Sequence, residues 1–206
     1  MNRATGKRLG IAALVALMAV TLVSTAMSGT KGKRKQADTA VAKLRNAEGK
    51  PAAKVRLREG RDGSVRVAVR ARGLTPGFHG FHIHETGVCE APSESADGET
   101  GSFLSAGGHF ARGDQGHGSH AGDMPPLFAT RDGKARAAFV IDSYRVRELT
   151  AGDGSAIMIH SDPDNSANIP DRYRSSEADE PGPDADTLKT GDSGTRVACG
   201  VARDKR

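Results

Sequence analysis

Short segments in which apolar and polar residues alternate run through the chain from about residue 40 onward. Residues 54–58 read Lys-Val-Arg-Leu-Arg, and residues 65–70 read Val-Arg-Val-Ala-Val-Arg. Because successive side chains of a β-strand point to opposite faces, this period of two predicts half-buried strands with a charged outer face. The Arg-Asp-Gly sequence at residues 61–63 is typical of the turn of a hairpin.

Further short apolar segments predict more strands of the same kind. They lie at residues 41–44, 78–84, 127–130, 135–141, 156–160 and 196–202, while residues 144–150 favour a short helical turn. About eight short strands joined by turn-rich links predict an all-β fold, either a sandwich or a Greek-key barrel.

Two long polar segments, residues 85–126 and 162–195, interrupt these strands. The first is rich in Gly, Ser, Asp and His, and the second carries several prolines. Segments of this length without regular structure are unusual inside a compact domain, where they are either functional or disordered. We therefore expect two long loops that carry function.

The N-terminus has the layout of a secretory signal. Arg3, Lys7 and Arg8 precede an apolar stretch at residues 11–23, and small residues follow up to Ala26. An uncleaved membrane anchor is the alternative, but the stretch is shorter than the roughly 20 residues that span a bilayer. We expect residues 1–26 to be a signal peptide that is cleaved near Ala26.

The remainder of the chain, after the predicted signal peptide, divides into a tail and a folded domain. Residues 27–38 are basic and polar, which predicts a flexible basic tail, and residues 39–206 form the predicted folded domain. We expect a protein that is secreted, periplasmic or held at the cell envelope, with no stable membrane span after processing. Its state, monomer or homodimer, is not fixed by any motif.

The formal net charge of +5 raises the question of an anionic partner such as nucleic acid. The basic residues are scattered along the sequence, and the one dense run, residues 31–35, falls in the predicted tail. No aromatic residues alternate with these cations as a base-stacking surface requires, so we expect no nucleic-acid partner.

The chain contains two cysteines, Cys89 and Cys199. In an exported protein two well-placed thiols usually form a disulfide, and the alternative is two free buried thiols. Export favours the disulfide.

All histidines of the chain lie between residues 79 and 160. His82 and His84 are two residues apart on a predicted strand, so both imidazoles point to one face and can reach one metal. Two surface-facing histidines are the alternative. His160 ends another predicted strand, at the beginning of the second long loop.

The first long loop holds a second set of potential ligands. His109, His117, His120 and Asp123 lie in a glycine-rich segment, and three imidazoles with one carboxylate suit a tetrahedral zinc ion. A polar loop with many histidines is the alternative. Imidazoles without thiolates suit both copper and zinc, so the residues alone predict an exported β protein with one or two histidine-rich metal sites.

Four motifs add a resemblance to a known family. They are residues 80–85 (Gly-Phe-His-Ile-His-Glu), 106–110 (Ala-Gly-Gly-His-Phe), 120–123 (His-Ala-Gly-Asp) and 191–200 (Gly-Asp-Ser-Gly-Thr-Arg-Val-Ala-Cys-Gly). In this order they resemble the copper/zinc superoxide dismutase family, over roughly residues 40 to 203. The resemblance implies an eight-stranded Greek-key β-barrel that holds copper and zinc.

The resemblance also implies roles for individual residues. It assigns copper to His82, His84, His109 and His160, zinc to His109, His117, His120 and Asp123, an outer hydrogen-bonding role to Asp164, a disulfide to Cys89 and Cys199, anion docking to Arg196, anion attraction to Lys189 and a structural hydrogen-bonding role to His79. One departure is visible: the segment between His117 and His120 is shorter than in many members.

The activity implied is the disproportionation of superoxide into dioxygen and hydrogen peroxide, with His109 and Arg196 as the catalytic residues. An exported copper-binding or copper-buffering protein without turnover is the alternative, but buffering requires neither Arg196 nor a bridging His109. A zinc hydrolase ranks last, because four protein ligands leave no open position on the zinc.

Overall fold

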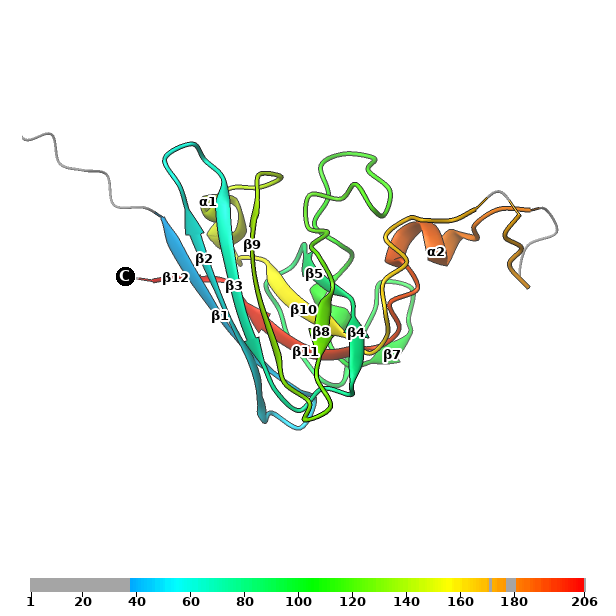
Figure 1. Ribbon diagram of the computed structural model, residues 1–206, viewed down its shortest axis with the longest axis horizontal. Helices are drawn as coiled ribbons and strands as arrows, with labels where there is room; N and C mark the ends of the chain where they lie inside the picture. Colours follow the sequence, from blue (N-terminus) through cyan, green and yellow to red (C-terminus); the bar gives the residue numbers. More distant parts are fainter. Residues whose placement is uncertain (1–37, 171, 177–180, 206) are drawn as a thin grey trace, which may run out of the picture. The chain divides into compact units, whose positions relative to one another are not determined.

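A computed structural model of the protein describes residues 38–170, 172–176 and 181–205 (Figure 1). The predicted signal peptide, residues 1–26, and residues 27–37 of the predicted tail lie outside the described residues. Among the described residues, no helix is both long enough and apolar enough to cross a membrane.

Antiparallel strands form one continuous sheet that closes almost completely into a barrel. In spatial order these strands are β4 (Gly77–His79), β8 (Leu127–Ala129), β9 (Ala135–Ile141), β3 (Val65–Ala71), β2 (Pro51–Glu59), β1 (Thr39–Arg45), β11 (Arg196–Val201), β10 (Ala156–His160) and β5 (Phe81–His84), with β12 (Arg203–Asp204) paired to β1. The crossovers from β3 to β9 and from β1 to β11 are typical of a Greek-key barrel.

The two ends of this sheet belong to one stretch of chain. β4 pairs with β8, β5 pairs with β10, and only Gly80 separates β4 from β5. Residues 77–84 therefore bring the first strand of the sheet next to the last one and close the barrel. Counted as one strand, they leave eight strands around the barrel besides the short β12, and the all-β prediction is confirmed.

The alternating pattern accounts for the core. In β2 and β3 the apolar side chains of Val55, Leu57, Val65 and Val67 are fully buried, while the intervening charged residues are exposed. The predicted helical turn forms α1 (Val146–Thr150), which buries Leu149 in the same core.

The two long loops contain more structure than their sequences indicate. The first carries a small separate sheet of β6 (Ser93–Glu94) and β7 (Thr100–Gly101) and a 3-10 turn, η1 (Leu104–Ala106). The second contains α2 (Ala185–Thr190). Asp184 caps the N-terminus of this helix, because its carboxylate accepts a hydrogen bond from Thr187 N at 2.8 Å.

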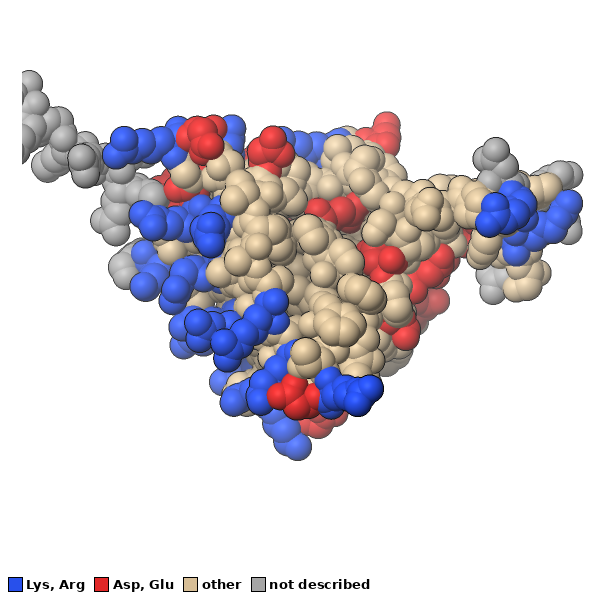
Figure 2. Space-filling view, in the orientation of Figure 1, with Lys and Arg blue, Asp and Glu red and all other residues tan. Residues whose placement is uncertain are grey.

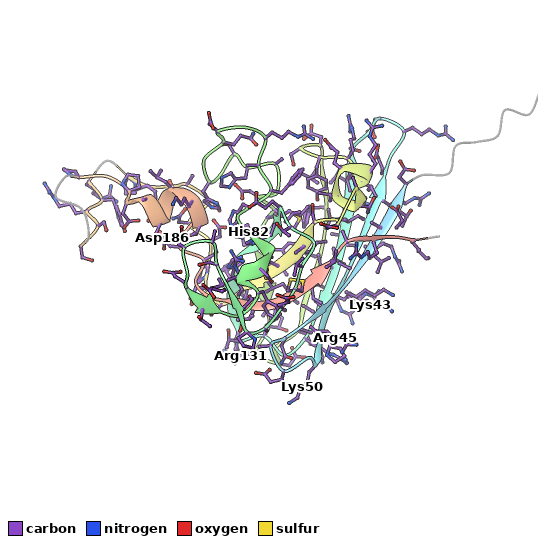
Figure 3. The ribbon with its side chains drawn as sticks, turned by 180° about the vertical axis from the view of Figure 1, so that it is seen from behind. Lys43, Arg45, Lys50, His82, Arg131 and Asp186 are labelled. Atoms are coloured by element: carbon purple, nitrogen blue, oxygen red, sulfur yellow. A yellow bond between two sulfur atoms is a disulfide. The ribbon has the colours of Figure 1, made fainter. Side chains whose placement is uncertain are left out.

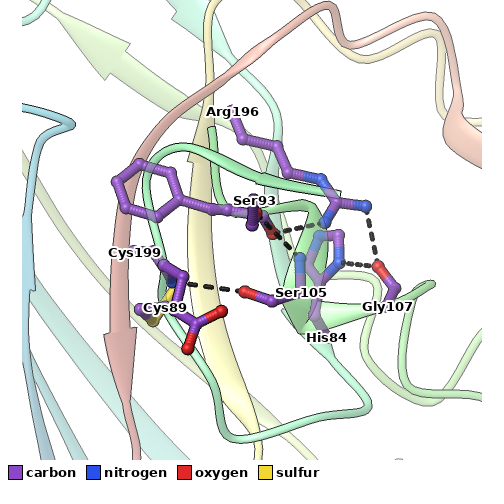
Figure 4. The surroundings of a disulfide bond; sticks show 9 residues. His84, Cys89, Ser93, Ser105, Gly107, Arg196 and Cys199 are labelled. Atoms are coloured by element: carbon purple, nitrogen blue, oxygen red, sulfur yellow. Dashed lines mark hydrogen bonds between the residues drawn. A yellow bond between two sulfur atoms is a disulfide. The ribbon is translucent and has the colours of Figure 1, made fainter. Parts of the chain in front are cut away.

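A disulfide joins Cys89, at the start of the first long loop, to Cys199 in β11, which confirms the predicted pairing (Figure 4). Met158 of β10 and Phe103 pack with Cys199 in a small apolar cluster of their own, beside the main core. The disulfide thus ties the first loop to the barrel wall.

We expect the double variant Cys89→Ser, Cys199→Ser to unfold at lower urea concentration, with a loss of about 4–5 kcal/mol in the chain-entropy description. The reason is that the bond joins residues 110 positions apart and so restricts the unfolded chain. Urea titrations followed by circular dichroism measure the loss. The wild-type protein under reducing conditions should match the variant, and equal stability of variant and oxidised wild type would contradict the prediction.

Candidate metal centre

The first long loop returns to β5 and extends the sheet at that edge. Isolated bridges pair His84 with His109 and His82 with Asp123. Phe110 N donates to Ile83 O at 2.8 Å, and Ile83 N donates to the Gly122 carbonyl at 2.9 Å. A side chain at Gly122 would overlap the Ile83 carbonyl, so glycine permits this close approach. Residues from the loop therefore lie directly beside the two histidines of β5.

One group of potential ligands contains only imidazoles. His82 and His84 from β5, His109 from the loop and His160 from the end of β10 offer ring nitrogens that lie within 4.8 Å of one another. All four side chains are buried. This is the set that the family resemblance assigns to copper.

Asp123 lies at the centre of the second group. Its Oδ1 is 3.0 Å from the Nδ1 atom of His109, 3.5 Å from that of His117 and 3.3 Å from that of His120. The structure thus gathers the four residues that the resemblance assigns to zinc, in spite of the short segment between His117 and His120. His109 is common to both groups, and its Nδ1 is the ring nitrogen that lies at Asp123.

His82 also lies within 4.8 Å of the ligand atoms of His109, His117 and Asp123. Its Nε2, however, donates to Asp164, which leaves only Nδ1 free. A single free nitrogen serves one metal, so we place His82 with the imidazole group and His120 with Asp123.

Asp164 connects the two groups. One carboxylate oxygen accepts the hydrogen bond from His82 Nε2, and the other accepts from His117 Nε2 at 2.8 Å. Each Nε2 therefore carries a proton, and the Nδ1 atoms of His82 and His117 are buried without a hydrogen-bond partner. Buried polar nitrogens without a partner are costly, and a metal cation would satisfy both.

The remaining imidazoles of the first group are oriented in the same way by backbone carbonyls. His84 Nδ1 donates to Gly107 O at 2.9 Å, and His160 Nδ1 donates to Gly194 O at 3.3 Å. Their Nε2 atoms are left as acceptors and face each other at 3.3 Å. Two lone pairs at this distance repel unless a cation lies near both, so this group fits a transition metal, and the family resemblance assigns copper to it. Three imidazoles and one carboxylate make the second group fit zinc.

The pKa values of the histidines suit these roles. Burial lowers the pKa of His84 and His160 well below the usual value, and it lowers the pKa of His109 to about 4. These rings are therefore neutral, which is the form that binds a metal. Burial also acts to lower the pKa of His117, but Asp123 and Asp164 outweigh it and raise the pKa to about 9. The two carboxylates thus favour positive charge at His117, and a bound metal cation would supply that charge in place of the proton on Nδ1.

Arg196 extends from β11 into the space beside the imidazole group. Its guanidinium donates to Phe103 O and to Gly107 O, both at 2.7 Å (Figure 4). The Gly107 carbonyl also accepts the proton of His84 Nδ1. One backbone oxygen therefore fixes both a potential copper ligand and a permanent positive charge.

The other predicted site residues lie outside the two groups. The ring nitrogens of His79 face the carbonyls of His160 and Thr75 at 2.7 and 2.8 Å, as expected of a structural histidine. Lys189 is exposed on α2, and no contact places its side chain at either group. Sequence reasoning missed the carbonyls of Phe103, Gly107 and Gly194. Of these, Gly107 and Gly194 had a signal, since each lies in one of the quoted motifs.

Two adjacent imidazole-rich groups on a nearly closed antiparallel barrel define a β-barrel protein with paired transition-metal sites. Residues 52–202 match the sequence profile described as "Copper/zinc superoxide dismutase (SODC)". The chain belongs to the copper/zinc superoxide dismutase family.

Relatives named "Superoxide dismutase [Cu-Zn]" are similar to the chain over its folded part. That of Mycolicibacterium paratuberculosis is 46% identical over 142 residues, which are 67% of this chain and 62% of the relative. That of Mycobacterium tuberculosis is 44% identical over 140 residues, 67% of this chain and 58% of the relative. The chain thus spans about three-fifths of the length of these relatives.

A solved structure shares the fold. The Cu/Zn superoxide dismutase from Brucella abortus matches with a TM-score of 0.59 and 32% identity, over 79% of this chain and 98% of that chain.

We expect Asp164→Asn to lower the retention of both metals. An amide presents an NH₂ group to one of the two imidazole N–H donors, so His82 or His117 loses its orientation. Loss of such outer contacts typically weakens metal affinity by about 10–100-fold. Elemental analysis after dialysis against a chelator measures the effect. The control is Asp97→Asn on the exposed surface of the first loop, and full metal content in Asp164→Asn would contradict the prediction.

Proposed function

We propose that this protein is a superoxide dismutase, which converts two superoxide ions and two protons into dioxygen and hydrogen peroxide. The observation that carries the proposal is the fixed guanidinium of Arg196, held by the same carbonyl that orients His84. Family membership supports it. When bound, copper supplies the one-electron redox change, and zinc supplies a structural cation without redox change.

Individual residues of the chain have separate roles in the proposed reaction. Arg196 binds the substrate anion beside the imidazole group, since its charge is permanent and its position is set by two backbone carbonyls. His109 is shared by both ligand groups, and its Nδ1 lies 3.0 Å from Asp123. That contact holds the ring in place while its other nitrogen, which serves the imidazole group, carries a proton to the product. We assign Lys189, exposed on α2, to attraction of the anion.

We further propose that the protein is exported. Disulfides are rare in reducing compartments, so the Cys89–Cys199 bond supports a secreted, periplasmic or envelope location. Residues 1–26 are proposed as the cleaved signal peptide, 27–38 as the tail and 39–206 as the enzyme domain, which functions as a monomer or homodimer.

The direct test of the function combines metal content with superoxide consumption. Protein with about one copper and one zinc per chain should lose activity on copper removal and regain it when copper returns. Activity with copper alone would limit zinc to a dispensable role. Copper binding without any consumption of superoxide would overturn the proposal in favour of a copper-buffering protein.

We expect Arg196→Ala to keep both metals but to lower activity about tenfold or more, because the docking charge is lost. The dependence of the rate on ionic strength should also weaken. Superoxide consumption at several salt concentrations measures both effects. Arg203→Ala is the matched control, since Arg203 is exposed and donates only to the Asp153 carbonyl. An unchanged rate in Arg196→Ala would remove its docking role.

We expect His120→Ala to lower zinc content and thermal stability before it abolishes copper-dependent turnover. Its Nδ1 lies at Asp123 and not in the imidazole group, so the first ligand group stays complete. Elemental analysis, a melting curve and an activity assay on one preparation separate these effects. Ser119→Ala, in the same loop, serves as the control. Full zinc content in His120→Ala would exclude His120 as a ligand.

A further inference from the structure

Basic side chains predominate on the outer surface of one wall of the barrel. We call it the basic face; it consists of Lys43 and Arg45 on β1, Lys54, Arg56 and Arg58 on β2, Arg66 and Arg70 on β3, and Arg136 on β9 (Figures 2 and 3). None of the exposed residues of these four strands is acidic. Cations that are scattered along the sequence are therefore gathered on one surface by the fold.

The strand register places these cations directly opposite one another. Lys43 pairs with Lys54, Lys54 with Arg70, and Arg70 with Arg136, which forms an unbroken row across four strands. At the usual strand spacing this row is about 14 Å long. Like charges directly opposite each other destabilise a sheet. The fold therefore carries an electrostatic cost at this surface.

No anion within the described part of the chain offsets that cost. Ion pairs of Lys and Arg occur there between Arg112 and Glu148 and between Lys134 and Asp132, and neither involves the basic face. A depression of about 410 Å³ is lined by all four cations of the row, by Arg45, Arg72 and Lys134, and by apolar residues of the same strands. The surface thus offers both unpaired charge and space for anionic groups.

Attraction of superoxide to the metal centre does not explain the basic face. The potential copper ligands come from β5, β10 and the first long loop, whereas the basic face lies outside β1, β2, β3 and β9. Opposite walls of a barrel are about 10 Å apart between backbones, and the side chains of the basic face point outward from there. The Debye length is about 8 Å at physiological ionic strength, so solvent ions screen these charges from the site.

We propose that the basic face is a docking surface for a bilayer that contains anionic lipids. Its charges repeat along the strands as well as across them, so they form a two-dimensional grid. A grid matches a plane of headgroups, whereas a linear polyanion would contact one row. The exposed positions carry no aromatic side chain for stacking on bases.

The experiment compares the binding of metal-loaded, processed protein to sedimented vesicles. One set contains about one-third phosphatidylglycerol in phosphatidylcholine, and the other contains phosphatidylcholine alone. The wild type should bind the anionic vesicles at about 0.15 M salt, release at about 0.5 M, and ignore the neutral ones. Equal binding to both vesicle types, or to neither, would overturn the proposal.

Two double variants with the same change of net charge separate the basic face from charge in general. Lys54→Glu with Arg70→Glu should weaken vesicle binding about tenfold or more. Arg172→Glu with Arg174→Glu, in the second long loop, should change it less than about twofold. Each new carboxylate faces one remaining cation, Lys43 or Arg136, but the two carboxylates also face each other. A melting curve therefore accompanies the binding assay, and the two variants are compared only at a temperature at which both are folded. Equal losses in both variants would contradict a specific surface.

A separate binding assay tests a soluble polyanion as the alternative partner. Double-stranded DNA or heparin is added to the protein in the absence of vesicles. Binding to either that depends on Lys54 and Arg70, together with no binding to anionic vesicles, would assign the basic face to a soluble polyanion and overturn the membrane proposal.

Discussion

The carboxylate of Asp164 is the contact on which both ligand groups depend. It accepts hydrogen bonds from His82 on β5 and from His117 in the first long loop, and so it fixes the tautomers of two imidazoles at once. Each imidazole then presents a bare Nδ1 inward. Backbone carbonyls do the same for His84 and His160. A preformed site of this kind binds a metal without first having to reorient its ligands, because the outer contacts have already done so.

The barrel could be predicted from the sequence because its signal is local. Alternation in β2 and β3 follows directly from the pleat of a strand, and the short helix after β9 was also predictable. The structure of the two long loops was not, because it depends on contacts between distant residues. His117 N, for example, donates to Leu188 O, so the first loop is held by α2 in the second. No window of sequence contains both partners.

In the metal centre, too, some features could be predicted from the sequence and others could not. Residue type and spacing, with the family resemblance, indicated the potential ligands and the outer hydrogen-bonding residue Asp164. The carbonyls that orient Arg196 and the histidines have no side-chain signature and could not be predicted individually. The basic face is the opposite case: alternation in the sequence marks Lys54, Arg56, Arg58, Arg66 and Arg70 as exposed strand positions. Its continuity depends on the register of four strands, which a pattern of alternation leaves undetermined.

The closing strand of the barrel, residues 77–84, carries a further consequence. Its first half pairs with β8 and its second half with β10, so it is the seam along which the sheet meets itself. His82 and His84 lie in the second half, and their potential partners are on β10 and in the loop docked to β5. A metal bound by residues from these elements would link the strands that close the barrel. Part of the binding free energy of the metal would then stabilise the closed barrel, and loss of the metal would destabilise the barrel first at residues 77–84.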